Sequence, residues 1–387
     1  MNNQSTSYQL IIAGAGAAGL SLLMRLIGNG YLEKNRVLLI DKDEKIRNDR
    51  TWCFWETDPG FFEDIIYRRW SQLDFFSSYF SGPLTIHPYQ YKLIRGIDFY
   101  TYCFDTIRCH PNITWWKASV QSITETAQGV SVKAEGEEER LYPGAQAFSS
   151  IPMPVTDQPN AIQLLQHFKG WVIRTEQPCF DPARATLMDF RISQQKGTAF
   201  VYVLPFSAHE ALVEYTLFTS SLLEPQQYED GLRDYLKQYL QLDNYTVTEE
   251  EFGVIPMTNT RFPRRVNGVF QLGTAGGQTK PSSGYTFRFI QKQSDLLAAA
   301  LLQGRPIDET ATSAARFRFY DEVLLQVLYR RLYPGHAVFA RLFRRNTATQ
   351  VFRFLDNESK LPAELRLISS LPVWPFLKAA LQKKSPY

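Results

Sequence analysis

Three glycines near the start of the chain constrain its fold more than any other feature. Gly14 and Gly16 follow an apolar run at residues 8–13, and Gly19 lies in the first turn of a helical pattern at residues 17–27. Glycine is required where the backbone turns tightly and where a helix packs closely against a strand. A second buried strand follows, so this segment predicts a strand, a tight turn, a helix and another strand.

This arrangement is typical of dinucleotide-binding folds. The first glycine permits the turn, the second leaves room for a pyrophosphate, and the third lets the helix approach the strand. Asp41 ends the second strand at residues 36–41, where an acidic side chain can bind a ribose hydroxyl. We therefore expect Gly14, Gly16, Gly19 and Asp41 to bind a dinucleotide, the alternative being a packing turn without a ligand.

A second glycine-rich stretch lies far from the first in sequence. It reads GTAGGQTKPSSGY at residues 273–285, between a strand expected at 268–273 and a helix expected near 285–303. Two such turns favour FAD over NAD, with one at the pyrophosphate and the other near the ribityl chain and flavin ring; a tight packing turn is the alternative. The glycines expected to contact the cofactor here are Gly273, Gly276, Gly277 and Gly284.

Composition excludes several other classes of protein. With 44% hydrophobic and 21% charged residues among 387, the chain can bury a large core and is not disordered. A net charge of +3, spread along the chain, argues against nucleic-acid binding. The four cysteines form no C-x-x-C pair, so we expect reduced thiols and no metal site. No uncharged run is long enough to predict a transmembrane helix.

Strand patterns dominate the middle of the chain. Residues 185–192, 199–206 and 211–218 are separated by short polar breaks, which predicts an antiparallel meander. The other elements that the pattern predicts are a loop-rich segment (43–91), a helix (90–108), a strand (112–116), a hairpin (119–136) and a helix (229–240).

One strand of the meander contains a carboxylate among apolar neighbours. On this strand Leu212, Glu214, Thr216 and Phe218 share one face, and the opposite face is also apolar. We expect a central strand with Glu214 buried or in a cleft, where desolvation raises its pKa and retains a proton near neutral pH. The alternatives are an exposed glutamate on an edge strand and an ion pair with an arginine such as Arg191.

Several blocks of the chain resemble the flavoprotein-type lycopene cyclases of bacterial carotenoid pathways. The blocks, in the order that the family has them, are GAGAAGLSL (14–22), DRTWCFW (49–55), LLQHFKGW (164–171), MDFRI (188–192), FVYVLP (200–205), LVEYTLF (212–218), GVIPM (253–257) and GTAGGQTKPSSGY (273–285). Related hydroxylases usually have Gly-Asp in the second flavin motif, whereas this chain has Gly273-Thr274. That departure favours a cyclase over a hydroxylase.

The resemblance implies an isomerase that cyclises the acyclic ends of lycopene to β-rings, giving β-carotene via γ-carotene, by acid catalysis without net redox change. It also implies FAD that is active when reduced, NADPH as the electron donor, and lycopene and carotenoid intermediates as partners. The family's presumed proton donor falls on Glu214 in the L-x-E-x-T block. The alternatives are a FAD-dependent aromatic hydroxylase, an isoprenoid reductase and a non-catalytic carotenoid carrier.

Other residues are weaker candidates for the site. Glu56 and Asp189 are alternative acids, and His209 is interpreted as an ordinary turn residue. Four aromatic residues are candidates to line a carotenoid tunnel by facing a cation, with core packing as the alternative: Trp52, Phe54, Trp55 and Trp171.

We expect an α/β fold: a Rossmann-type FAD-binding domain of the glutathione-reductase/aromatic-hydroxylase type, which the resemblance implies, with an inserted antiparallel β-sheet substrate domain. The expected parts are the first FAD-binding part (1–90), a mixed part that includes the antiparallel sheet (91–250), the second FAD-binding part (251–305) and a helical C-terminal region facing membrane or substrate (306–387).

A long carotenoid is soluble in membranes, so the enzyme has to meet a bilayer. Residues 336–355 alternate apolar residues with arginines, which predicts a basic amphipathic helix able to lie in the interface. The alternative is a helix packed on the domain with its arginines in solvent. We expect a cytoplasmic protein that associates peripherally with the inner face of the membrane.

Overall fold

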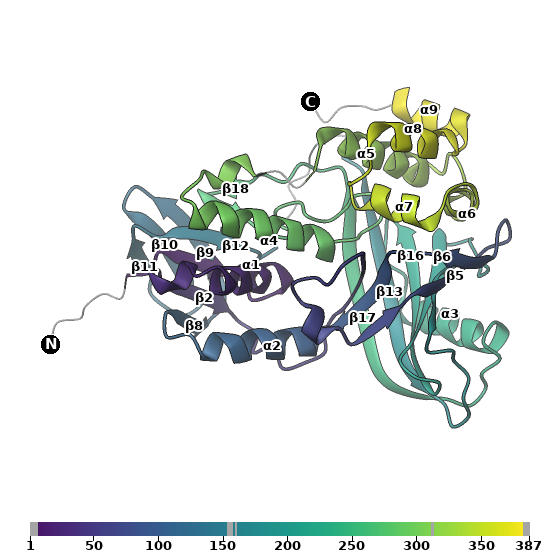
Figure 1. The fold of residues 1–387 in the computed structure, drawn as a ribbon, viewed down its shortest axis with the longest axis horizontal. Coiled ribbons are helices and arrows are strands. Elements are labelled where there is room, and N and C mark those ends of the chain that lie inside the picture. Colours follow the sequence, from purple (N-terminus) through teal and green to yellow (C-terminus); the bar gives the residue numbers. More distant parts are fainter. Residues whose placement is uncertain (1–6, 153–157, 159–160, 311–312, 382–387) are drawn as a thin grey trace.

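One half of the molecule is built on a mainly parallel six-stranded sheet (Figure 1). The computed structural model describes residues 7–152, 158, 161–310 and 313–381. Strand order is β18-β19-β12-β1-β2-β8, in which only β18 is antiparallel to its neighbour. The strands are β1 (Leu10–Ala13), β2 (Val37–Asp41), β8 (Ile113–Lys117), β12 (Gln146–Ser149), β18 (Arg265–Val266) and β19 (Val269–Gln271).

The two faces of this sheet are covered by different kinds of structure. Helices α1 (Ala17–Gly28), α2 (Gly96–Arg108) and α4 (Phe287–Leu302) pack on the face that carries Leu10 and Ile12. The other face, which carries Ile11, is covered by an antiparallel meander of β9 (Val120–Thr126), β10 (Gly129–Ala134) and β11 (Arg140–Pro143). Strand β1 is therefore buried on both faces, as the uninterrupted apolar run at its position requires.

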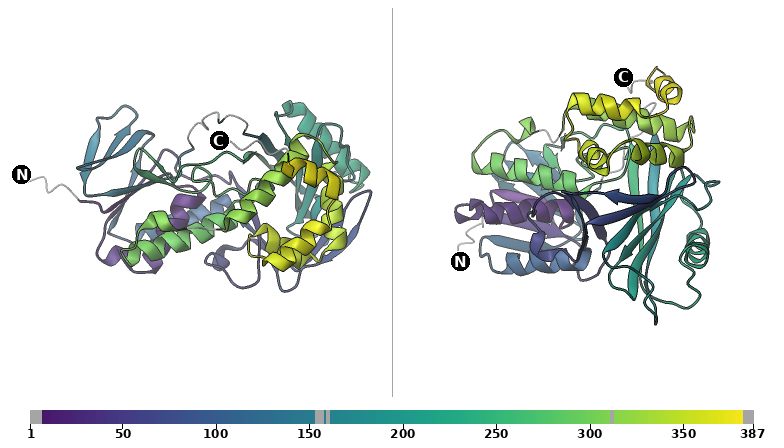
Figure 2. Two further views of the ribbon diagram at one scale, coloured as in Figure 1. Left: turned by 90° about the horizontal axis from the view of Figure 1, so that it is seen from above. Right: turned by 45° about the vertical axis from the view of Figure 1, so that its right-hand side comes forward.

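The other half is a seven-stranded sheet in the order β17-β13-β16-β15-β14-β5-β6, antiparallel except between β14 and β5. Helix α3 (Pro225–Gln238) packs on one face, and the C-terminal helices lie on the other (Figures 1 and 2). The strands are β5 (Gln72–Phe76), β6 (Gly82–Thr85), β13 (Gln163–Arg174), β14 (Arg184–Asp189), β15 (Thr198–Pro205), β16 (Glu210–Thr219) and β17 (Thr246–Thr258).

A small sheet and a helical segment complete the fold. The small sheet has the order β3-β7-β4, and short 3-10 turns occur at η1 (Tyr31–Glu33), η2 (Glu63–Ile65) and η3 (Ile307–Glu309). Its strands are β3 (Thr51–Glu56), β4 (Arg68–Trp70) and β7 (Gln90–Arg95). The C-terminal helices are α5 (Ala315–Tyr329), α6 (Gly335–Arg345), α7 (Ala348–Leu355), α8 (Leu361–Ser369) and α9 (Val373–Leu381).

Most of the expected elements are confirmed, including the strand–turn–helix–strand unit, the hairpin and the central meander. Two predictions are wrong. The segment 43–91 contains four complete strands instead of loops, and residues 90–95 form β7 instead of the start of a helix. Strand β7 pairs with both β3 and β4, and these long-range hydrogen bonds outweigh a local helical pattern.

The sequence pattern also does not predict β13 and β17, the two strands that flank the site described below. The division of the chain at residues 90, 250 and 305 remains a prediction. Strands from both sides of residue 90 contribute to each large sheet, because β5 and β6 join the seven-stranded one and β8 joins the six-stranded one.

The C-terminal segment proposed to lie in a membrane interface packs on the protein instead. The Phe339 ring of α6 stacks on Phe190, with ring centroids 5.7 Å apart, and Phe343 lies 5.1 Å from Phe75. The alternative, a packed helix with exposed Arg344 and Arg345, is confirmed. Across the described ranges, no helix combines the length and apolarity needed to cross a bilayer.

The approach of α1 to β1 depends on Gly19. A Cβ atom there would lie 2.0 Å from the carbonyl oxygen of Gly14, so Gly19→Ala must push the helix away from the turn. We expect a loss of about 1–3 kcal/mol or more in the free energy of unfolding, measured by chemical denaturation. Gly28, at the end of the same helix, is the control, because its Cβ would only touch Phe61 at 3.8 Å. An unchanged stability in Gly19→Ala would contradict this packing.

Candidate active site

The first glycine-rich turn leaves open space in front of α1. Gly14 has φ +100°, and a Cβ there would lie 2.2 Å from Ser150 Oγ, so the turn itself requires this glycine. Gly16 differs, because its φ of −86° suits any residue and a Cβ would have no atom within 4 Å. No side chain caps the helix at Gly16. The free amides and the space beside them fit an anionic group such as a pyrophosphate.

Asp41 lies at this same turn. Its Oδ2 accepts a hydrogen bond from the Ala15 amide at 2.6 Å, and its Oδ1 accepts one from the Asp43 amide at 2.8 Å. Lys45 Nζ lies 3.7 Å from Oδ1. The expected acid therefore reaches the loop from the end of β2, and it also holds one of the loop amides.

The second glycine-rich stretch packs directly on the first. Gly273 has φ +57°, and a Cβ there would lie 2.7 Å from the Cβ of Ala18 in the first turn of α1. A Cβ on Gly276 would lie 2.3 Å from the carbonyl oxygen of Gln271, and one on Gly277, at φ +73°, would lie 3.2 Å from Phe262. These glycines are explained by the tight turn, and the turn brings two sequence-distant motifs together.

The same stretch extends to the seven-stranded sheet and to the C-terminal helices. A Cβ on Gly284, at φ +71°, would lie 2.1 Å from Gln166 Oε1 of β13. Lys280 is buried, and its Nζ lies 2.8 Å from Asp321 Oδ1 of α5 and 2.7 Å from Asn357 Oδ1. The turn is therefore held between the two halves of the molecule.

Glu214 lies on a central strand, as predicted. Strand β16 is third in the seven-stranded sheet, and Glu214 stands opposite Gly170 of β13 on one side and Tyr202 of β15 on the other. Thr216 donates a hydrogen bond to Glu214 Oε1 at 2.7 Å. Burial, and then the charge of Glu251, raises the pKa of the Glu214 carboxyl well above its ordinary value. Glu214 therefore retains its proton where an exposed glutamate loses it.

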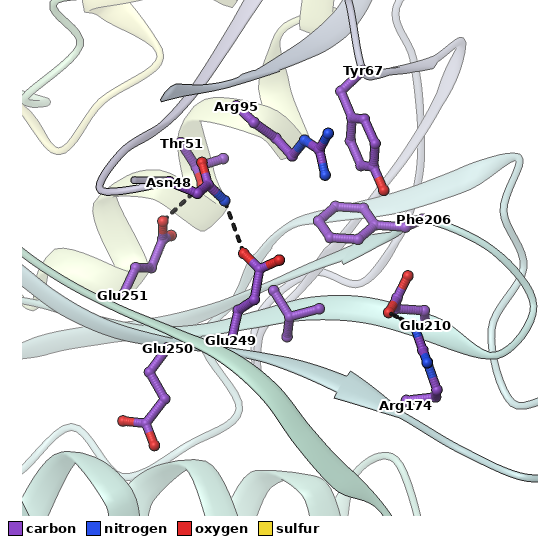
Figure 3. A pocket seen from close by; sticks show the side chains of 11 residues that line it. Asn48, Thr51, Tyr67, Arg95, Arg174, Phe206, Glu210, Glu249, Glu250 and Glu251 are labelled. Atoms are coloured by element: carbon purple, nitrogen blue, oxygen red, sulfur yellow. Dashed lines mark hydrogen bonds and ion pairs between the residues drawn. The ribbon is translucent and has the colours of Figure 1, made fainter. Parts of the chain in front are cut away.

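Glu251 is a site residue that the sequence pattern does not reveal. It lies on β17, opposite Gly170, and Thr51 donates a hydrogen bond to its Oε2 at 2.7 Å. Burial raises its pKa as well. In the sequence, Glu251 belongs to a run of three glutamates at residues 249–251, a pattern typical of a solvated surface. Successive side chains of a strand point to opposite faces. Glu249 and Glu251 therefore point toward Asn48 and Thr51, and Glu250 points the other way (Figure 3).

A pocket of about 230 Å³ opens beside Glu251 (Figure 3). Its lining residues are Asn48, Thr51, Tyr67, Arg95, Val172, Arg174, Phe206, Glu210, Glu249, Glu250 and Glu251. The pocket is polar and lies at the edge of the sheet, next to the carboxyl group that neighbours Glu214.

Three tyrosines and one cysteine lie in the neighbourhood of Glu214. Tyr202 and Tyr285 lie close to Glu214, Tyr91 lies beside Cys53, and burial raises the pKa of all four groups. These groups are therefore neutral at physiological pH. Tyr285 ends the second glycine-rich stretch, so that stretch reaches the surroundings of Glu214.

The alternative acids form ion pairs with cationic side chains. Glu56 lies 3.1 Å from the buried Lys92 Nζ and 2.5 Å from Arg288 Nη1. Asp189 is fully buried, and Arg191 Nη2 lies 2.5 Å from its Oδ2. Both carboxylates are structural ion-pair residues in this arrangement. The ion pair considered between Arg191 and Glu214 is not formed, because Arg191 binds Asp189.

The tryptophans and His209 have structural roles. Trp52 stacks on Phe287, Trp55 stacks on Phe352 with ring centroids 4.3 Å apart, and Phe54 also stacks on Phe287. Trp171 belongs to the apolar cluster on the α3 face of the sheet, opposite to Glu214. Core packing is therefore confirmed for these four aromatic residues. His209 is exposed in the turn before β16, as expected.

The chain is similar to known proteins over almost its whole length. A family model described as lycopene cyclase protein matches residues 9–381. The chain is 26% identical to a lycopene β-cyclase of Pantoea ananas over 399 aligned residues, which cover 97% of each chain.

Two solved structures share the fold, which confirms the expected fold class. A flavoprotein/dehydrogenase from Cytophaga hutchinsonii has a TM-score of 0.65 and 12% identity, with 98% of this chain and 100% of that chain covered. A geranylgeranyl bacteriochlorophyll reductase-like protein from Thermoplasma acidophilum has a TM-score of 0.58 and 13% identity, with 97% and 96% covered.

Proposed function

We propose that this chain, which belongs to the lycopene cyclase family, closes the acyclic ends of lycopene into β-rings with Glu214 as the proton donor. The similarity to a lycopene β-cyclase over 97% of the chain supports the reaction. The observation that carries the role of Glu214 is its place on a central strand, opposite Tyr202 and Gly170, where burial raises its pKa.

The chemistry of cyclisation matches these surroundings. A proton is added to the terminal double bond, an internal double bond attacks the resulting tertiary cation, and the ring carbon then loses a proton. One ring carbon–carbon bond forms at the expense of the terminal double bond, and loss of the proton restores the internal double bond. No atoms or electrons are gained or lost, and the enzyme is an isomerase of the intramolecular lyase type. The acid has to be protonated and shielded from water, because water quenches a carbenium ion. Neutral aromatic faces stabilise such a cation.

The two glycine-rich turns fit FAD. Gly14, Gly16 and Gly19 would hold the pyrophosphate at the N-terminus of α1, and Asp41 would bind the ribose. Gly273, Gly276, Gly277 and Gly284 would hold the stretch that reaches from α1 to Tyr285 near Glu214. When bound and reduced by NADPH, the flavin supplies a negative charge that stabilises the cation.

Gly16 distinguishes cofactor binding from folding. Gly16→Val should fold with near-normal stability, because the backbone angles suit valine and the space is open. It should not retain FAD, because the side chain fills the space proposed for the pyrophosphate. The measurement is flavin absorbance per mole of folded protein, with Gly28→Ala as the control on the same helix. Full flavin occupancy in Gly16→Val would contradict the assignment.

The proton donor is tested by Glu214→Gln. The amide is nearly isosteric, so fold and FAD content should remain, but β-ring formation should fall about 100-fold or more because an amide is too weak an acid. Glu214→Asp should retain partial activity, since catalysis is sensitive to a displacement of about 1 Å. The measurement is pigment composition per mole of folded, flavin-loaded protein. Glu176→Gln, an exposed glutamate that follows β13 and does not line the pocket, should cyclise normally.

The Gln variant also separates catalysis from stability. If Glu214 had only a structural role, Glu214→Gln would lower the melting temperature while the remaining folded protein made β-carotene at the normal rate. That outcome would overturn the proton-donor assignment.

A reductase of isoprenoid chains is the second candidate, because the reductase-like protein of Thermoplasma acidophilum has the same fold. Anaerobic turnover distinguishes the two. A cyclase converts lycopene without stoichiometric loss of NADPH, whereas a reductase consumes one NADPH for each double bond reduced. A hydroxylase on this fold would not react without oxygen.

We place the proposed membrane contact on α8 and α9 instead of α6 and α7. These two helices expose large apolar side chains, with 79% of Trp374, 77% of Leu381 and 65% of Val373 accessible. Leu361, Leu365 and Leu377 are exposed beside them, together with the basic Lys360, Arg366 and Lys378. An apolar surface with basic residues among it is suited to anionic lipid headgroups and acyl chains. Peripheral association with the inner face of a cytoplasmic membrane follows as part of this proposal.

Lipid binding should depend on this surface. The double variant Trp374→Ser, Leu377→Ser should bind vesicles of phosphatidylglycerol and phosphatidylcholine at least about 10-fold more weakly in a flotation assay, because it removes exposed apolar area. Binding by the unchanged chain should also weaken with salt. Leu141→Ser, an exposed leucine on the distant β11, is the control. Equal flotation of both variants would move the contact to another surface.

A further inference from the structure

The register of three neighbouring strands aligns Glu214 and Glu251 on one face of the sheet. Gly170 of the middle strand β13 stands opposite Glu214 of β16 and also opposite Glu251 of β17. Side chains at matched positions of adjacent strands point to the same face. The two glutamates therefore approach each other over a residue that has no side chain.

Gly170 is what allows them to meet. A Cβ atom at this position would lie 3.0 Å from Cγ and 3.2 Å from Oε1 of Glu251, and 3.0 Å from Leu212 on the other side. Its backbone angles do not explain the glycine, since its φ does not lie in the left-handed region. The space that glycine leaves is occupied by the Glu251 side chain.

Each carboxyl group has one oxygen satisfied by a threonine. Thr216 donates to Glu214 Oε1 and Thr51 donates to Glu251 Oε2, both at 2.7 Å. The other oxygen of Glu251, Oε1, is enclosed and receives no hydrogen from a hydroxyl, amide or cationic group within the described part of the chain. The two carboxyl groups lie close enough over Gly170 for Glu251 to raise the pKa of Glu214. Two carboxyl groups can hydrogen-bond only when a proton lies between them.

We propose that Glu214 and Glu251 form a carboxyl pair that shares one proton, with Glu251 as the positioning residue that keeps Glu214 protonated. This inference rests on the proposed function for its catalytic meaning, but the pair itself is a property of the strands. Two adjacent carboxyl groups do not both ionise, because like charges in one site repel. The pair retains a proton at neutral pH and can deliver it from Glu214 to the polyene.

Within the described part of the chain, no cationic side chain is among the groups that shift the pKa of Glu214. Cys53, Tyr202 and Tyr285 lie near Glu214 and are neutral. Arg50 and Glu249, of opposite charge, act on Glu251. Arg50 favours the anion on Glu251, so the shared proton belongs chiefly to Glu214.

The test is Glu251→Gln in the full-length, flavin-loaded chain. Its first measurement is isotope-edited infrared spectroscopy with ¹³C-labelled glutamate, which detects a protonated carboxyl group without any turnover. The unchanged chain should show a protonated glutamate at pH 7 that disappears in Glu214→Gln. In Glu251→Gln the titration midpoint of this group should fall by about one pH unit or more, because the neighbouring negative charge is gone.

The second measurement is the pH profile of cyclisation. Glu214 has to be protonated to act, so activity falls as pH rises through the pKa of the pair. In Glu251→Gln the alkaline limb should shift to lower pH by the same amount, at unchanged FAD content. Glu229→Gln is the control, because this glutamate lies on α3, on the opposite face of the sheet, and pairs with Lys169. If Glu251 had only a structural role, Glu251→Gln would lower the melting temperature and leave the alkaline limb of the pH profile unchanged.

Gly170→Ala provides an independent variant that keeps both glutamates. Its added methyl group lies where the Glu251 side chain passes, so it should separate the pair and shift the same titration downward. If neither Glu251→Gln nor Gly170→Ala moves the midpoint, the shared proton is refuted.

The two proposals fail in different ways. If the infrared titration depends on Glu251 but the chain does not convert lycopene, the pair exists and the proposed function is wrong. If the chain converts lycopene through Glu214 while Glu251→Gln leaves both titration and pH profile unchanged, the function holds and the pair is wrong.

Discussion

The site depends on the burial of β16 between two apolar layers. One face of this strand packs on α3 through Val213, Tyr215 and Leu217, and the other contributes Leu212 and Phe218 to the core below the C-terminal helices. Glu214 interrupts the second face. Because the carboxyl is largely withdrawn from water among apolar neighbours, ionising it is costly and its protonated form is favoured. The same residue on an exposed strand would be an ordinary anion.

Local patterns predict the parts of the site that one segment encodes. The turn at Gly14, Gly16 and Gly19 is confirmed, and its local spacing is enough to predict it, since Gly19 contacts Gly14 and Ile12 of the same strand–helix unit. The face of β16 that carries Glu214 follows from strand alternation alone. The fold class could also be predicted, since an apolar strand before a glycine turn and a later antiparallel meander restrict the architecture to few arrangements.

Pairing between distant segments could not be predicted in the same way. Glu251 lies in a charged run at residues 249–251 that is typical of a solvated surface, and only the register of β17 with β13 shows which of its members faces inward. The strand at residues 90–95 could not be predicted for a similar reason, because it is stabilised by pairing with β3 and β4. In the helical segment 336–355, amphipathicity identifies an apolar face but does not say whether protein or lipid covers it.

The buried ammonium of Lys280 has a consequence for how the chain can be divided. It emerges from the second glycine-rich stretch, and its partners, Asp321 and Asn357, belong to the C-terminal third. A charge in such a place is tolerated only while its counter-charge is present, so a chain shortened before α5 would carry an unpaired cation beneath the turn. The C-terminal helices are thus a structural support for the nucleotide-type half and not an appendage to it. A chain in which another region replaced these helices would have to replace the lysine too.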